Sequence, residues 1–163
     1  MRSGRTVPSL FIDLDGVLAD FDGAYGRHFG ALPDRTAALT PEFWPNIRRH
    51  GQFFRDLPPM PDMTDLWVGA LALHRRPVIL SGVPPEVPDA ADQKRAWIDA
   101  HLGADVPAIF CKSRDKRRHG KPDDVLIDDW VKYRHLWERM GGVFVLHRST
   151  PESLSAAREA LGI

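Results

Sequence analysis

Five short apolar runs, each ending in polar or turn residues, constrain the fold of this chain more than any other feature. They occupy residues 9–12, 77–80, 108–110, 125–127 and 143–146. Short apolar runs without alternating polar residues are typical of strands buried on both faces, as in parallel sheets. Apolar residues at helical spacing lie between several of these runs. The pattern therefore predicts an α/β fold, a Rossmann-like parallel sheet with helices on both faces.

The segments between the runs differ in regularity. From residue 30 to 61, repeated prolines stand among aromatic residues, which predicts an irregular, compact insertion. The chain, residues 1–163, is then one domain with a small cap inserted after the first strand, at about residues 20–62. We expect helices over 18–29, 63–73, 89–102 and 130–140, and a terminal helix that Thr150 caps, with Pro151 at its first position.

Composition excludes several classes of protein. The 22 Lys and Arg residues balance the 22 Asp and Glu residues, so no general attraction to nucleic acid or to an anionic membrane is expected. The single cysteine, Cys111, has no partner within the chain for a disulfide or a thiolate zinc site. The first apolar run is too short for a signal peptide or a membrane span. We expect a cytoplasmic protein, and the sequence leaves its oligomeric state open, a homodimer included.

Polar side chains follow three of the apolar runs at the point where each run ends. Asp13, Ser81 and the pair Asp128-Asp129 occupy these positions. In open α/β sheets, ligands bind outside the carboxyl ends of the strands, at the topological switch point. We therefore expect carboxylates and a hydroxyl from separate strands to lie at one edge of the sheet.

Each of these signals has an ordinary explanation when it is taken alone. Asp13-Leu-Asp15-Gly16 also fits a turn or a fragment of a calcium-binding loop, but it lacks the remaining acidic residues of an EF-hand. Asp128-Asp129 also fits a helix cap. Taken together, carboxylates at one sheet edge repel one another by about 4 kcal/mol per close pair, which a divalent cation would relieve. Oxygen ligands favour Mg²⁺ over zinc at such a site.

These residues match a known family in their order and in their strand context. Asp13-Leu-Asp-Gly-Val-Leu, Ser81, a lysine between residues 112 and 121, and Asp128-Asp129 resemble the four ordered motifs of the haloacid dehalogenase-like (HAD) phosphohydrolases. Longer motifs resemble the 5'(3')-deoxyribonucleotidase branch of that superfamily. They are residues 15–21, Phe53-Phe54-x-Asp-Leu-Pro-Pro-Met-Pro, Lys94-x-x-Trp97 with His101-Leu-Gly103, Arg114-Asp-Lys116 and Leu126-Ile-Asp-Asp129.

The resemblance implies an enzyme, a Mg²⁺-dependent phosphomonoester hydrolase that acts as a 5'-nucleotidase on (deoxy)nucleoside monophosphates. Asp13 would be the nucleophile, which forms an aspartyl-phosphate, and Asp15 would act as general acid and base. The metal ligands would be Asp13, Asp15 through its backbone carbonyl, and Asp128, with Asp129 as a ligand or an outer neighbour. Mg²⁺ is therefore the cofactor that we expect.

The same resemblance assigns phosphate binding to Ser81, to the amide of Gly82 and to Lys116. Two departures from the family pattern bear on this assignment. The motif at Ser81 normally reads Thr-Ser, so Ser81-Gly82 keeps the hydroxyl but lacks one side chain near the phosphate. The stretch between Lys116 and Asp128 is longer than in those enzymes, which leaves Lys121 as an alternative. We prefer Lys116 because Arg-Asp-Lys matches on both sides.

Aromatic residues in and beside the insertion are candidates for stacking on a nucleobase. They are Phe21, Phe43, Trp44, Phe53 and Phe54, and they fit equally well a hydrophobic core of the insertion itself. We expect a small phosphate ester as partner, a nucleoside monophosphate, rather than a nucleic-acid polymer or a membrane. Two alternatives stay open: a phosphatase of another small ester, and a catalytically silent nucleotide-binding module, against which the intact Asp13 and Asp15 argue.

Overall fold

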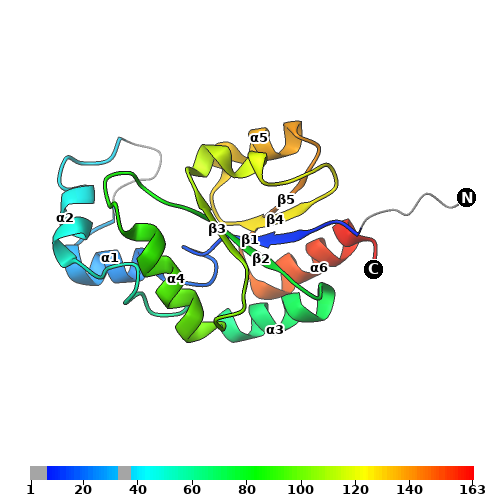
Figure 1. Cartoon of the computed structure of the whole chain (residues 1–163), viewed down its shortest axis with the longest axis horizontal. Coiled ribbons are helices and arrows are strands. Elements are labelled where there is room, and N and C mark those ends of the chain that lie inside the picture. The colour runs from blue at the N-terminus through cyan, green and yellow to red at the C-terminus, as the bar shows by residue number, and fades with distance from the viewer. Residues whose placement is uncertain (1–6, 33–37) are drawn as a thin grey trace, which may run out of the picture.

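The computed structural model of the protein describes residues 7–32 and 38–163. Five parallel strands form one sheet in the order β3-β2-β1-β4-β5 (Figure 1). All five predicted strands are confirmed, and with helices on both faces they form the expected Rossmann-like α/β fold. The strands are β1 (Leu10–Ile12), β2 (Val78–Gly82), β3 (Ala108–Cys111), β4 (Val125–Asp128) and β5 (Val143–Leu146).

The register of the central strand β1 brings distant acidic residues together. Ile12 lies opposite Ile79 of β2 on one side and Ile127 of β4 on the other. The chain runs outward from β1 through β2 to β3 and returns to β4 on the opposite side, so the topological switch point lies between β1 and β4. Asp13 continues the ladder there, because its amide donates to the carbonyl of Ile127 at 2.9 Å. Asp13 and Asp128 are therefore neighbours at the switch point.

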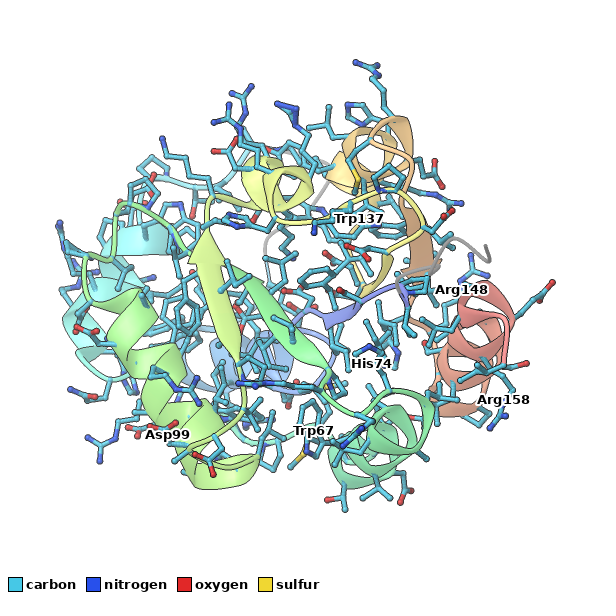
Figure 2. The ribbon with its side chains drawn as sticks, turned by 45° about the vertical axis from the view of Figure 1, so that its right-hand side comes forward. Trp67, His74, Asp99, Trp137, Arg148 and Arg158 are labelled. Atoms are coloured by element: carbon cyan, nitrogen blue, oxygen red, sulfur yellow. The ribbon has the colours of Figure 1, made fainter. Side chains whose placement is uncertain are left out.

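Helices cover the two faces of the sheet. α3 (Met63–Leu73), α4 (Ala90–His101) and α6 (Thr150–Leu161) lie on one side, and α5 (Arg134–Arg139) lies on the other (Figure 1). The first face holds the larger core, and its members include Leu10, Ile12, Leu66, Trp97 and Ile127. The second face holds a smaller core of Phe11, Leu80, Leu126, Trp137 and Phe144. Trp137 comes from α5 (Figure 2), and its ring meets that of Phe11 edge-on.

Three helix predictions were wrong in detail. The first helix, α1 (Phe21–Phe29), begins after a tight turn in which Gly16 donates to the carbonyl of Ala19, and Asp20 caps it by accepting from Gly23. Ser149, not Thr150, caps α6, because its hydroxyl accepts from the amide of Glu152. The single helix expected over 130–140 is split into a 3₁₀ turn, η2 (Val131–Tyr133), and α5.

The proline-rich insertion was predicted as irregular, but it contains a helix, α2 (Phe43–His50). Pro45 is tolerated there because the amides of the first helical turn have no partner within the helix. Gly51 ends α2 at a φ of 83°, a conformation that favours glycine. α1 and α2 lie together at the end of the molecule toward which β1 runs (Figure 1). Residues 33–37 of the insertion lie outside the described residues.

No helix in the described parts of the chain is both long and apolar enough to span a bilayer.

Candidate active site

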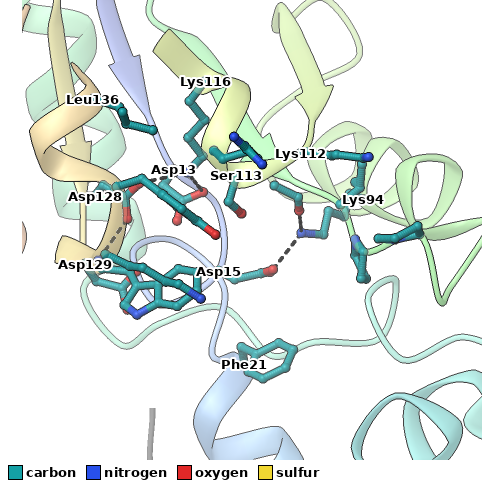
Figure 3. Close-up of a pocket in the computed structure, with 18 of the residues that line it drawn as sticks. Asp13, Asp15, Phe21, Lys94, Lys112, Ser113, Lys116, Asp128, Asp129 and Leu136 are labelled. Carbon is teal, nitrogen blue, oxygen red and sulfur yellow. Dashed lines mark hydrogen bonds and ion pairs between the residues drawn. The ribbon is translucent and has the colours of Figure 1, made fainter. Parts of the chain in front are cut away.

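A cavity of about 640 Å³ lies beyond the carboxyl ends of β1, β2 and β4 (Figure 3). Its wall also includes a 3₁₀ helix, η1 (Ser113–Arg118), that follows β3, and residues from the insertion. Most of the predicted site residues line this cavity: Asp13, Asp15, Phe21, Phe43, Trp44, Gly82, Lys116, Asp128 and Asp129. Segments far apart in the sequence therefore converge on one site.

Lys116 joins the first and last acidic motifs. Its Nζ lies 2.9 Å from Oδ1 of Asp13 and 2.8 Å from Oδ2 of Asp128, and all three side chains are buried. Burial alone would lower the pKa of Lys116, but the charges of Asp13 and Asp128 and its hydrogen bonds to both hold it above its usual value. Burial and the charge of Asp13 raise the pKa of Asp128 to about 6, although Lys116 acts against this shift.

The acidic residues fit a hard divalent cation. One carboxylate oxygen from each of Asp13, Asp128 and Asp129 lies within 4.8 Å of the other two. Gly16, at a φ of 78°, lets the Asp129 carboxylate lie close to the backbone of the loop after β1, because a β-carbon at residue 16 would collide with that carboxylate. A set of carboxylate oxygens is the donor chemistry that Mg²⁺ prefers. The residues present therefore suit the expected cofactor.

Asp15 is held by a lysine that the sequence analysis did not place in the site. Nζ of Lys94, on α4, lies 2.6 Å from Oδ2 of Asp15 (Figure 3). Burial raises the pKa of Asp15 above its usual value; the charge of Lys94 opposes this shift, and the charge of Asp13 adds to it. The other oxygen, Oδ1, is buried and has no hydrogen-bond partner among the described residues. Lys94 thus binds one oxygen of Asp15, and the other oxygen is enclosed without a hydrogen-bond partner among the described residues.

The predicted phosphate-binding residues lie beside this pair. Ser81 is fully buried at the end of β2, and its Oγ accepts from Lys94 at 3.0 Å. Gly82 lines the cavity, where a β-carbon would collide with the hydroxyl of Ser113. Ser113 therefore fills the space beside Gly82 that a larger residue at position 82 would occupy. Lys121 is exposed and is not among the residues that line the described cavity, so the geometry favours Lys116.

The aromatic candidates divide into two groups. Phe21, Phe43 and Trp44 line the cavity. Phe53 is only 2% exposed, is not among the described lining residues, and packs edge-on against Phe21 with a ring-centroid distance of 5.4 Å. Its neighbour Phe54 lines the cavity instead. The aromatic cluster therefore forms both a hydrophobic core and part of the cavity wall.

Sequence reasoning did not place several lining residues in the site, although some of them, Lys94 and Arg114 included, stand in the matched motifs. Lys94 stands in the motif Lys94-x-x-Trp97, where its order along the chain gave no indication that it meets Asp15. Ser113, Trp130 and Tyr133 also line the cavity. None of these three was part of a motif from which a role was assigned.

The fold and the site together define a class of protein. A parallel sheet with Asp-x-Asp after β1, a hydroxyl on β2, a lysine after β3 and an acidic pair at β4 is the arrangement of the HAD-like hydrolases. The chain matches the family model "5' nucleotidase, deoxy (Pyrimidine), cytosolic type C protein" over residues 5–144, and it belongs to this family. It is therefore an enzyme, a HAD-like nucleotidase.

Three relatives illustrate this similarity. A protein of Bordetella pertussis named "Putative 5'(3')-deoxyribonucleotidase" is 29% identical over 74% of this chain and 73% of its own. A protein of the same name from Bordetella bronchiseptica is 30% identical over the same shares. The human "5'(3')-deoxyribonucleotidase, mitochondrial" is 27% identical over 79% of this chain and 64% of its own.

Proposed function

We propose that the protein is a Mg²⁺-dependent 5'-nucleotidase that hydrolyses (deoxy)nucleoside monophosphates through an aspartyl-phosphate on Asp13. The observation that carries this proposal is the position of two differently held carboxylates in one cavity. Lys116 pairs with Asp13, while Asp15 is bound through one oxygen and keeps the other without a partner among the described residues. Membership of the family supports the class of reaction, and the names of the relatives support the deoxynucleotide substrate.

The two carboxylates would divide the reaction between them. An oxygen of Asp13 would attack phosphorus while the sugar oxygen leaves with a proton from Asp15, and Asp15 would then take a proton from the water that hydrolyses the aspartyl-phosphate. The raised pKa of Asp15 favours the protonated form that the first step requires. The Gly82 amide and Lys116, which line the cavity, would bind the phosphoryl oxygens and stabilise the charge that develops on them, while the buried hydroxyl of Ser81 would support Gly82.

Asp13, Asp128 and Asp129, with the backbone carbonyl of Asp15, would hold the metal ion. When bound, Mg²⁺ would neutralise charge where an anionic carboxylate meets an anionic phosphate. Removing it with EDTA should abolish phosphate release, and adding Mg²⁺ in excess should restore it. An unchanged rate in EDTA would contradict this part of the proposal.

The insertion, at about residues 20–62, would act as a small cap over this site. Phe21, Phe43 and Trp44 would stack on the nucleobase, a contact worth about 1 to 3 kcal/mol per base. Phe53 would support Phe21 from behind instead of meeting the base, because it is buried beneath that ring. The cytoplasmic location and the oligomeric state, a homodimer included, stay predictions.

A substrate panel tests the proposed function. The ratio kcat/KM should be measured for dUMP, dTMP, GMP, 3'-nucleotides, sugar phosphates and phosphoserine, with Asp13→Asn as the inactive control. We expect nucleoside monophosphates to be preferred, because only they place a base against the aromatic wall. Equal values across the panel would favour a phosphatase of other small esters. Binding of nucleotides without turnover would favour a silent binding module.

A further inference from the structure

Lys94 is a buried cation that the reaction proposed above does not use. Its side chain is 1% exposed, the lowest value among the described charged residues of the core. Removing an ammonium group from water costs several kcal/mol unless close partners offset that cost. The partners of Lys94 therefore identify what its position achieves.

All three protons of the Lys94 ammonium have an acceptor. Nζ lies 2.6 Å from Oδ2 of Asp15, 3.0 Å from Oγ of Ser81 and 2.6 Å from the carbonyl oxygen of Gly82. An ammonium group has three donors and no acceptor, so these contacts use its whole capacity. No proton of Lys94 is left to bind a phosphoryl oxygen. Lys94 thus acts on the groups around the substrate rather than on the substrate itself.

The contacts of Lys94 connect two segments of the site, Asp15 after β1 and Ser81-Gly82 at the end of β2. Asp15 is fixed through Oδ2, and its Oδ1 is buried without a hydrogen-bond partner among the described residues. Ser81 accepts from Lys94 through Oγ, so its own hydroxyl proton is directed elsewhere. The acceptor for that proton, the carbonyl of Gly82, lies at 3.5 Å and is also bound by Lys94 at 2.6 Å. Ser81 is fully buried and is not among the described residues that line the cavity, so Lys94 and the Ser81 hydroxyl both bind the carbonyl of Gly82, which does line it.

The position of the Lys94 ammonium is itself fixed from several sides. The ring of Phe54 lies beneath it, with Nζ 4.7 Å from the ring centroid. On the same helix, Oε1 of Gln93 accepts from the amide of Phe54, and Nε1 of Trp97 donates to the carbonyl of Leu57. Helix α4 is thus attached to the 53–57 segment on both sides of Lys94, which limits the movement of the ammonium.

We propose that Lys94 is a positioning residue, which holds the acid/base carboxylate of Asp15 and the backbone of Gly82 in one fixed arrangement. This inference rests on the proposed function, because it gives Lys94 a role only if Asp15 and Gly82 act on a phosphate ester. It differs from two simpler roles. A direct ligand of the phosphate would mainly affect substrate binding, and a purely structural ion pair would affect stability without regard to the step that Asp15 performs.

The test is a double-mutant cycle on dTMP hydrolysis. kcat and KM should be measured for the wild type, Lys94→Met, Asp15→Asn and the double variant. A misplaced catalytic group costs about 100-fold in rate, so Lys94→Met should lower kcat by about that factor, with a much smaller change in KM. In the Asp15→Asn background, Lys94→Met should lower the residual kcat by less than about tenfold, because groups that act through one another are not additive.

Two further variants complete the test. Lys121→Met removes an exposed lysine outside the cavity and should leave kcat and KM unchanged. Lys94→Arg keeps the charge but cannot direct three donors to the same three acceptors, so it should lower kcat with little effect on KM. It keeps the inference testable if Lys94→Met does not fold, which circular dichroism and thermal unfolding would reveal.

Several outcomes would overturn the inference. They are wild-type kcat in either Lys94 variant, a loss confined to KM, or the same fold-loss in both Asp15 backgrounds. If the wild type releases no phosphate from dTMP or from p-nitrophenyl phosphate, the proposed function fails first, and the role of Lys94 fails with it. Failure at Lys94 alone, with an active wild type, leaves the proposed function intact.

Discussion

The carboxyl edge of the sheet and the aromatic cluster around Phe53 border the same cavity, but different forces hold them together. At the sheet edge, lysine nitrogens and carboxylate oxygens meet at 2.6 to 2.9 Å. In the cluster, the ring of Phe53 meets its aromatic neighbours at centroid distances of 5.4 to 6.4 Å. Individual atoms therefore matter at the edge, whereas filled volume matters in the cluster.

Lys116→Met should have the largest effect, because it breaks the polar edge at its centre. It leaves Asp13 and Asp128 buried beside each other without the cation between them. Removing one partner of a buried ion pair costs about 3 to 5 kcal/mol, so we expect a loss of that order in the free energy of unfolding, together with loss of turnover. Urea unfolding and phosphate release measure the two effects. Wild-type stability and activity would contradict the geometry described here.

Phe53→Ala and Trp44→Ala should distinguish the aromatic residue that packs in the core of the cluster from the one that lines the cavity. Phe53→Ala should lower the free energy of unfolding by about 3 to 5 kcal/mol, with little change in KM for the folded enzyme. Trp44, which is half-buried in the cavity wall, should behave differently when replaced by alanine. Its loss should raise KM for nucleotides by the equivalent of about 1 to 3 kcal/mol, with a smaller change in stability. The reverse pattern would place Phe53, not Trp44, against the base.

Gly82→Ala tests how closely the polar edge is packed. Its new β-carbon would collide with the hydroxyl of Ser113, an overlap that typically costs about 1 to 3 kcal/mol. We expect lower stability and a higher KM for phosphate esters. Adding Ser113→Gly should recover most of the stability, because it removes the colliding atoms. If the second substitution gives no recovery, Ser113 does not fill this space.

A pH titration of stability should show the smallest effect, at His147, which follows β5 and whose amide donates to the carbonyl of Asp128 at 2.9 Å. Burial lowers the pKa of His147 below its ordinary value of 6.5, although the charge of Asp62 opposes this shift, and Nδ1 lies 2.7 Å from Oγ of Ser153. The unfolded chain then binds a proton below about pH 6.5 more readily than the folded protein does. The contribution of His147 is therefore present above that pH and is lost as the pH falls. Urea unfolding of the wild type and His147→Gln measures it, and equal slopes against pH would exclude it.

The two regions also differ in how far the sequence predicted them. The strand ends were predictable because short apolar runs locate the strands and a parallel sheet brings their carboxyl ends to one edge. Asp13 after β1 and Asp128 at the end of β4 are neighbours, which confirms this prediction. Lys94 was not predictable as a partner of Asp15, since its place depends on how α4 packs against the insertion. The separate positions of Phe53 and Phe54, adjacent in sequence, depend on the same packing. Helix α2 was missed because Pro45 within it and Pro41 just before it concealed a helical start.

The central claim is that Asp13 captures the phosphoryl group while Asp15 moves the proton. Asp15→Asn should form the aspartyl-phosphate from p-nitrophenyl phosphate, whose leaving group requires no proton, but should hydrolyse it slowly. Mass spectrometry of the acid-quenched, digested protein tests this most directly. We predict a phosphoryl group on the peptide that contains Asp13, formed only when Mg²⁺ is present. A phosphoryl group on another residue, or none at all from a variant of an active wild type, would contradict the account.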